Sequence, residues 1–218
     1  MAKETDSKTQ NKPLCFVIMP FGKKKDADGN EINFDEVYKL LIHPAIEAAE
    51  MDPIRADEET VNGIIHKPMY ERLILCDYAV ADLTTANANV YYELGIRHAV
   101  KPYTTINIFA SGTKLLFDLN AVRCLPYDYD KEKYLVNIEK NIADLANQLK
   151  NAKKQKATDS PVYQLVDGIS FQNSVAHEKT DIFRDKVEYD KKMKASLAEA
   201  RSTEGGKSER IKAIDEIV

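Results

Sequence analysis

The chain has 218 residues, of which 44% are apolar and 8% aromatic, and its formal net charge is −4. This length suffices for one domain of ordinary size with an appendage. The acidic balance gives no global attraction to nucleic acid or to an anionic membrane surface, so we expect neither as a partner.

The chain begins with a polar stretch, residues 1–13, which we interpret as a disordered lead-in because it lacks the apolar segment of a secretion signal. The apolar run that follows, LCFVIMPF, is far shorter than the roughly 20 residues of a membrane span. The three cysteines lie far apart in the sequence, which indicates neither a disulfide framework nor a zinc site. These features predict a cytoplasmic protein without a bound metal.

Residues 14–21 are almost continuously apolar, as expected of a strand that is buried on both faces of a parallel sheet. Residues 22–32 are polar and predict a loop, whose lysines would contact a phosphate or, alternatively, only solvent. Asn33 can then cap a helix, with Glu36 in capping-box register. Pro44 should kink or split that helix.

Strands and helices alternate in the following part of the chain. We predict strands at 53–57, 78–83, 104–110 and 124–127, and helices at 64–76, 87–100 and 134–150. This alternation predicts an α/β fold, a doubly wound parallel sheet of about five strands like that of flavodoxins. Ligands of such sheets bind beyond the carboxyl ends of the strands. The stretches at that edge are 20–22, 57–63, 82–89 and 110–113.

The composition changes after residue 150. Residues 151–160 are typical of a linker, and residues 161–171 predict one short docked helix. From Glu178 onwards the density of charge indicates solvated helix or disorder. The last periodic segment stops in mid-stripe, which suggests that the natural protein continues beyond Val218. We therefore predict a lead-in at 1–13, an α/β domain at 14–153 and a charged, helical, partly disordered extension at 154–218.

Three short motifs fall at the predicted carboxyl edge: IMPFG, ADLT and NANVYYELGIR. Because carboxyl ends of parallel strands share one edge, we expect Phe21, Asp82, Asn87, Asn89 and Glu93 to converge on one cleft. A carboxylate beside C1′ of a ribose stabilises the positive charge that develops as the C1′–N bond breaks, or attacks C1′ covalently. A second carboxylate or an amide would hold the sugar hydroxyls, and an aromatic ring would stack on the base.

These motifs, in this order, resemble the nucleoside 2-deoxyribosyltransferase-like proteins that are related to TIR domains, over about residues 14–130. The segment NVYYELGIR is also similar to the TIR-like domain that precedes the TRAF-binding helical region in stress-activated MAP3 kinases and their bacterial relatives. By this resemblance Glu93 corresponds to the nucleophile of the deoxyribosyltransferases, Asp82 to a sugar-binding acid and Phe21 to the aromatic residue near the base. We expect four further residues to bind substrate: Gly22, Asp57, Asn89 and Tyr92.

The resemblance implies an N-glycosidase that cleaves NAD or a related nucleotide as a signalling or defence effector and acts as a homo-oligomer. NAD would be its substrate and not a cofactor. The second hypothesis is a non-catalytic module that binds a nucleotide or other copies of itself, with a protein partner on the C-terminal helices. A nucleoside 2-deoxyribosyltransferase is the third. The sequence contains neither GxGxxG nor a P-loop, so we predict neither redox use of NAD nor nucleoside triphosphate hydrolysis. The charged insertion KKKDADGNE departs from the transferase pattern.

Each candidate residue also has an ordinary structural interpretation. Glu93 stands four residues before Arg97, in the order that favours an ion pair on a helix surface. Asp82 can bond the backbone of the turn that follows it, and Asn87 can cap the next helix. Phe21, at the end of a strand, can belong to the core. Arg55 and Asp57 can form a surface ion pair instead of contacting a ligand.

Overall fold

The computed structural model describes residues 12–26, 28–56, 66–115, 122–130, 134–155, 157–169 and 177–201. The chain divides into two compact units, residues 1–172 and 173–218. The first unit contains the sheet and every candidate site residue that the structure describes.

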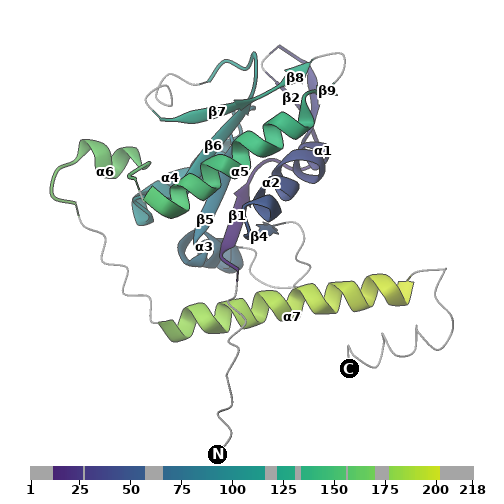
Figure 1. The fold of residues 1–218 in the computed structure, drawn as a ribbon, viewed down its shortest axis with the longest axis vertical. Coiled ribbons are helices and arrows are strands. Elements are labelled where there is room, and N and C mark those ends of the chain that lie inside the picture. Colours follow the sequence, from purple (N-terminus) through teal and green to yellow (C-terminus); the bar gives the residue numbers. More distant parts are fainter. Residues whose placement is uncertain are drawn as a thin grey trace, which may run out of the picture. The chain divides into compact units, whose positions relative to one another are not determined.

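The first unit is built on a five-stranded sheet in the order β4-β1-β5-β6-β7, in which all neighbouring strands are parallel (Figure 1). The strands are β4 (Asp52–Arg55), β1 (Leu14–Ile18), β5 (Tyr78–Asp82), β6 (Thr105–Ala110) and β7 (Cys124–Tyr127). This order is that of flavodoxin-like sheets, and the predicted α/β class is confirmed. All residues of β1 and β5 are buried, as central strands covered on both faces should be.

Helices cover both faces of this sheet (Figure 1). On one face, α1 (Phe34–Val37), η1 (Tyr38–Ile42) and α2 (His43–Ala48) pack with α5 (Ile138–Gln155). On the other face, α3 (His66–Leu75) packs with α4 (Ala88–Val100). The main apolar core joins the first group of helices to Cys15 and Val17 of β1 and to Met19, which directly follows that strand.

The first helical segment changes its winding just before Pro44. Residues 38–42 form a π-helical turn between two α-helical pieces, and Pro44 stands in the first turn of α2. Proline has no backbone N–H to continue the helical ladder, and the change of winding directly precedes it. The predicted interruption is confirmed. Asn33 also caps the segment as predicted, since its side chain accepts a hydrogen bond from the backbone N–H of Asp35.

The prediction of a loop over residues 22–32 is wrong in part, because an antiparallel hairpin forms there. It pairs β2 (Lys23–Lys25) with β3 (Glu31–Asn33). The carboxylate of Asp26 closes its turn by accepting hydrogen bonds from the backbone N–H groups of Asp28 (2.9 Å) and Asn30 (2.8 Å). These bonds are local and polar, so they leave no apolar periodicity in the sequence.

Helix α5 begins at Ile138, later than the predicted helix 134–150, and it continues to Gln155 through part of the predicted linker. Tyr134–Leu135 instead form β9, which pairs with β8 (Tyr129–Asp130). Asn137 has a φ of 49°, and this left-handed residue separates the small hairpin from the helix.

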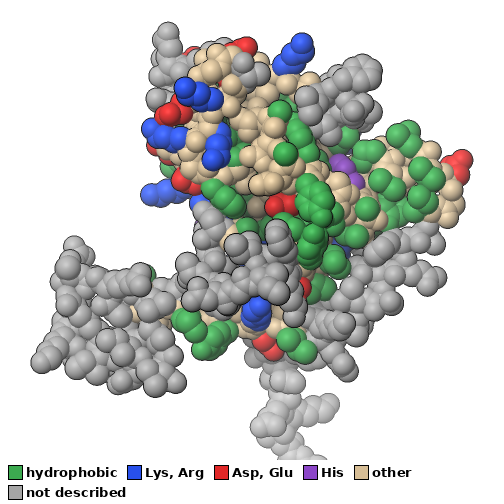
Figure 2. Space-filling view, turned by 180° about the vertical axis from the view of Figure 1, so that it is seen from behind, with side chains coloured by type: hydrophobic (Ala, Val, Ile, Leu, Met, Phe, Trp, Pro, Cys, Tyr) green, Lys and Arg blue, Asp and Glu red, His purple; other side chains and the backbone are tan. Residues whose placement is uncertain are grey.

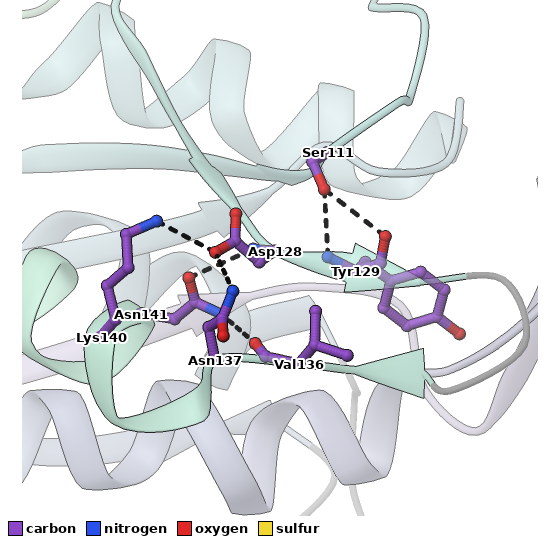
Figure 3. A network of polar contacts seen from close by, with 7 residues as sticks. All are labelled: Ser111, Asp128, Tyr129, Val136, Asn137, Lys140 and Asn141. Carbon is purple, nitrogen blue, oxygen red and sulfur yellow. Dashed lines mark hydrogen bonds and ion pairs between the residues drawn. The ribbon is translucent and has the colours of Figure 1, made fainter.

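Figure 3 shows the polar network that fixes the start of α5. The side chain of Asn141 accepts a hydrogen bond from the backbone N–H of Asp128 (3.2 Å) and donates one to the carbonyl of Val136 (2.8 Å). The carboxylate of Asp128 accepts from Asn137 (2.9 Å) and Lys140 (3.0 Å), and these two donors hold its pKa below the usual value. The network therefore fastens the chain that leaves β7 to the first turn of α5.

The chain after α5 returns to the end of α4. Two side chains donate hydrogen bonds to carbonyl groups there, Ser160 to His98 (2.7 Å) and Tyr163 to Ala99 (2.8 Å). Helix α6 (Pro161–Leu165) is shorter than the predicted helix 161–171. These contacts connect α6 to the first unit, which ends at residue 172. The unit is therefore longer than the α/β domain 14–153 that we predict from composition.

In the second unit, the charged stretch forms α7 (His177–Arg201). From the density of charge we predict either solvated helix or disorder for this stretch, and the structure has a helix there. Two apolar residues four apart, Phe183 and Val187, are buried. The segment 208–218 lies outside the described residues. No helix in the described part of the chain is long and apolar enough to cross a membrane.

Candidate functional site

The order of the strands places the candidate site between β1 and β5. From β1 the chain moves to β4 on one side, and then to β5, β6 and β7 on the other. In doubly wound sheets a ligand crevice forms at this point of reversal, outside the carboxyl ends of the strands. The chain leaves β1 through the IMPFG motif and β5 through the ADLT motif, so both motifs lie at this edge.

Glu93 lies on α4, which starts from the same edge. Asn87 caps this helix, because its side chain accepts hydrogen bonds from the backbone N–H groups of Asn89 (3.0 Å) and Val90 (3.2 Å). Glu93 is partly buried, and this burial raises its pKa to about 7 although the positive charge of Arg72 acts to lower it. A carboxyl group with such a pKa gives up and takes a proton readily at neutral pH.

The arginine whose charge acts on Glu93 is Arg72 of α3, which is itself buried. Arg97 has a different role. It is 0% exposed and donates hydrogen bonds to the carbonyl groups of Leu73 (2.8 Å) and Cys76 (2.9 Å), at the end of α3. The alternative interpretation of Glu93, as half of a surface ion pair with Arg97, is therefore wrong, because the guanidinium points into the protein.

Asp82 is fully buried at the end of β5. Its carboxylate accepts hydrogen bonds from the backbone N–H (3.0 Å) and hydroxyl (2.5 Å) of Thr84, and from the hydroxyl of Tyr127 (3.1 Å). Burial raises the pKa of Asp82 to about 6, and these hydrogen bonds oppose the rise. The hydroxyl of Thr84 also accepts from the N–H of Ala110 (2.9 Å). Asp82 thus fastens the turn after β5 to β6 and β7, and in this conformation its carboxylate is not exposed to a ligand.

Phe21 and Gly22 turn the chain away from β1. Phe21 is 40% exposed, and the guanidinium carbon of Arg55 lies 5.4 Å from the centre of its ring. Asp35 holds Arg55 and Gly22, the two neighbours of Phe21, in place. Its carboxylate forms an ion pair with Arg55 (3.0 Å) and accepts a hydrogen bond from the N–H of Gly22 (3.2 Å). Gly22 has a φ of 63°, which favours glycine. One part of the Phe21 ring remains open to a ligand.

The remaining predicted residues are more exposed. Tyr92 is 57% exposed, and its hydroxyl oxygen lies 2.8 Å from that of Tyr70. Asn89 is exposed on the first turn of α4. Asp57 lies outside the described residues. The structure thus groups Asn89, Tyr92 and Glu93 on α4 and Phe21 with Gly22 after β1, whereas Asp82 is buried under the turn that leads into α4.

A cavity of about 660 Å³ opens beside the start of α4. It is lined by the β2/β3 hairpin, by the turn between β5 and α4, and by the loop after β6. The lining residues used below are Lys24, Lys25, Asp26, Asp28, Thr85 and Lys114. The sequence indicated Lys24 and Lys25 as lysines of a polar loop and placed Thr85 in the edge stretch 82–89 without a role, whereas Lys114 lies just outside the stretch 110–113.

No protein-family model matches the sequence, and no curated protein matches it significantly. The resemblance to the deoxyribosyltransferase-like proteins therefore rests on the three motifs and on their positions in the fold. In the part of the chain that the structure describes, no group of three or more His, Cys, Asp or Glu side chains is placed to hold a metal ion.

Proposed function

We propose that this protein is an N-glycosidase that cleaves the base–ribose bond of NAD or a related nucleotide. The observation that carries the proposal is the position of Glu93, a partly buried carboxyl group on the helix that starts at the ligand edge of the sheet, within reach of the charge of Arg72. Reactions that develop positive charge on a sugar need a carboxylate of this kind. The strand order supports a nucleotide as the ligand, because doubly wound sheets bind such ligands at the carboxyl edge.

In the proposed reaction, the bond between C1′ and the base nitrogen breaks, and both of its electrons leave with the nitrogen. The nicotinamide nitrogen of NAD is positively charged, so this base departs as a neutral molecule without taking a proton. Ionised Glu93 stabilises the charge on C1′ or forms an ester with it. Water then adds to C1′ and releases one proton, so the products are nicotinamide, ADP-ribose and a proton.

The other residues have roles that match their exposure. The open part of the Phe21 ring would stack on the base, and the exposed side chains of Asn89 and Tyr92 would contact the sugar. Asp82 would act indirectly, by fixing the turn from which α4 starts. Because only ionised Glu93 stabilises a positive charge, activity should rise with pH through about pH 7.

The substitution Glu93→Gln tests the proposal, because glutamine has the same shape but does not ionise. Parent and variant are incubated with NAD, NADP and a panel of nucleosides, and the products are separated by chromatography. We expect the parent to release base and the variant to lose at least about a hundredfold in rate. Glu139→Gln, which changes an exposed glutamate on α5, is the matched control and should keep the parent rate. Equal rates in the parent and Glu93→Gln would contradict the proposal.

A self-associating signalling module is the second candidate, and the apolar surface around α6 favours it. Leu165, Val166 and Ile169 are 77%, 50% and 43% exposed. Figure 2 shows hydrophobic side chains gathered on the right, where α6 lies. Self-association without turnover of any substrate would support this candidate. Exchange of bases between deoxynucleosides, with NAD left intact, would instead support the deoxyribosyltransferase hypothesis.

A further inference from the structure

We propose that the cavity between the β2/β3 hairpin and the start of α4 binds a phosphate group. We infer in addition that the substrate of the enzyme is a nucleotide and not an unphosphorylated nucleoside. This second statement rests on the proposed glycosidase function, whereas the first one does not.

The charge of the cavity favours an anion. Lys24 and Lys25 line it from β2, Lys114 lines it from the loop after β6, and all three side chains are exposed. Asp26 and Asp28 line it too, but the oxygens of Asp26 already accept hydrogen bonds within the hairpin turn. The lining thus contains three ammonium groups and two carboxylates, which leaves an excess of positive charge. Figure 2 shows Lys and Arg side chains with Asp and Glu side chains among them at the upper left, the side of the molecule on which the hairpin lies in Figure 1.

Thr85 gives the cavity a buried hydroxyl group. The residue is 8% exposed, and its hydroxyl oxygen has no hydrogen-bond partner among the described residues. A buried hydroxyl without a partner costs free energy, which a ligand oxygen would recover. The neighbouring Thr84 differs, because its hydroxyl is engaged with Asp82 and with the N–H of Ala110. Thr84 therefore fixes the turn, and Thr85 is left for a ligand.

The hydrogen-bond donors that line the cavity indicate which type of ligand it binds. The side chain of Asn87 already occupies the backbone N–H groups of Asn89 and Val90, so the helix terminus alone does not make the site. The side-chain donors of the lining include three ammonium groups and the hydroxyl groups of Thr85 and Thr113, and together they favour a ligand with several negatively charged oxygens close together. A phosphate ester meets this requirement and a neutral sugar does not. The volume of about 660 Å³ lies within the range of small-molecule sites, roughly 300–1,000 Å³.

The cavity and Glu93 lie along the same helix, although Glu93 does not line the cavity itself. Asn87 lines the cavity, and Glu93 follows it by six residues, which is about 9 Å along the helix axis at roughly 1.5 Å per residue. In a 5′-nucleotide the ribose separates the phosphate from the C1′–N bond. Six residues also turn the helix by about 600°, so Glu93 lies about 120° around α4 from Asn87. A nucleotide that contacts both must therefore reach around α4 as well as along it.

The test measures binding to the full chain by calorimetry with four probes: inorganic phosphate, pyrophosphate, AMP and adenosine. We expect AMP to bind at least about tenfold more tightly than adenosine, since each charge-assisted hydrogen bond contributes about tenfold. The triple variant Lys24→Ala/Lys25→Ala/Lys114→Ala should bind both alike. Thr85→Val keeps the shape of the side chain and should weaken AMP binding about fivefold. Lys150→Ala, at an exposed lysine of α5 outside the cavity, is the control and should not change binding.

Equal affinity of the parent for AMP and adenosine, or unchanged AMP binding in the triple variant, would overturn the phosphate site. Lysine-dependent binding of phosphate or pyrophosphate without tighter binding of AMP would keep the phosphate site and overturn the nucleotide assignment. The same titrations with Glu93→Gln separate the two proposals. If this variant binds AMP like the parent, and the parent releases no base from any substrate, the phosphate site stands and the glycosidase function fails.

Discussion

Replacing Glu93 by glutamine should change how the stability of the fold depends on pH, independently of any substrate. In the folded chain, burial raises the pKa of Glu93 from 4.5 to about 7. Between these pH values the folded chain keeps a proton that the unfolded chain has released. The free energy of unfolding therefore falls as the pH rises through this interval, and the loss is complete above about pH 7.

The size of this effect follows from the distance between the two pKa values. They lie about 2.5 pH units apart, and each unit corresponds to about 1.4 kcal/mol, which gives an upper limit of about 3.5 kcal/mol. Glu93 is only partly buried, so solvent screening reduces the expected loss to about 1–2 kcal/mol. Glutamine does not ionise. The variant should therefore gain about 1–2 kcal/mol relative to the parent between acid and mildly alkaline pH.

Urea unfolding followed by circular dichroism measures this gain at about pH 4.5, about pH 6 and about pH 8. The difference between Glu93→Gln and the parent should grow with pH. The difference for the control Glu139→Gln, at an exposed position of α5, should stay nearly constant. A difference for Glu93→Gln that is the same at all three pH values would refute the reasoning, because it would mean that burial does not oppose ionisation of this carboxyl group.

Three further substitutions test the structural interpretation by chemical denaturation. Arg97→Met should lower the free energy of unfolding by about 3 kcal/mol or more, because carbonyl groups at the end of α3 lose their buried donors. A loss below about 1 kcal/mol would contradict the role of Arg97 in holding the end of α3. Asn141→Ala should cost about 2 kcal/mol, since the N–H of Asp128 and the carbonyl of Val136 lose their partner, and an unchanged midpoint would speak against the network. Gly22→Ala should cost only about 1 kcal/mol, because its φ of 63° disfavours alanine while no atom lies within 4 Å of the added carbon; a loss above about 3 kcal/mol would reveal a clash.

The fold was predictable because its sheet and helices leave periodic apolar patterns. The strands β1 and β5 are buried on both faces and are therefore almost continuously apolar, and helices α2, α4 and α5 each bury apolar residues along one side. The hairpin of residues 23–33 leaves no such pattern, since the carboxylate of Asp26 and the backbone of its turn hold it together. Local polar contacts of this kind are not visible in the spacing of apolar residues.

The candidate site was predictable only in part. The motifs predict roles for Glu93 and Phe21, which stay predictions, and spacing alone also suggested a surface pair of Glu93 with Arg97. Arg97 is buried and donates a hydrogen bond to the carbonyl group of Leu73, which lies 24 residues away in the sequence. The spacing of residues along one helix does not predict such a long-range contact. Asp82 likewise bonds Tyr127, 45 residues further on. The tertiary structure therefore decides which charged residues remain available to a ligand.

The most direct test of the central claim is the rate of nicotinamide release from NAD by the purified chain and by Glu93→Gln, measured at about pH 8 and at low and high protein concentration. We expect release by the parent, rising with protein concentration if assembly completes the site, and a loss of at least about a hundredfold in the variant. Release at the same rate by both proteins would contradict the role of Glu93. No release from NAD or any nucleoside by the folded parent at high concentration would contradict the glycosidase function itself.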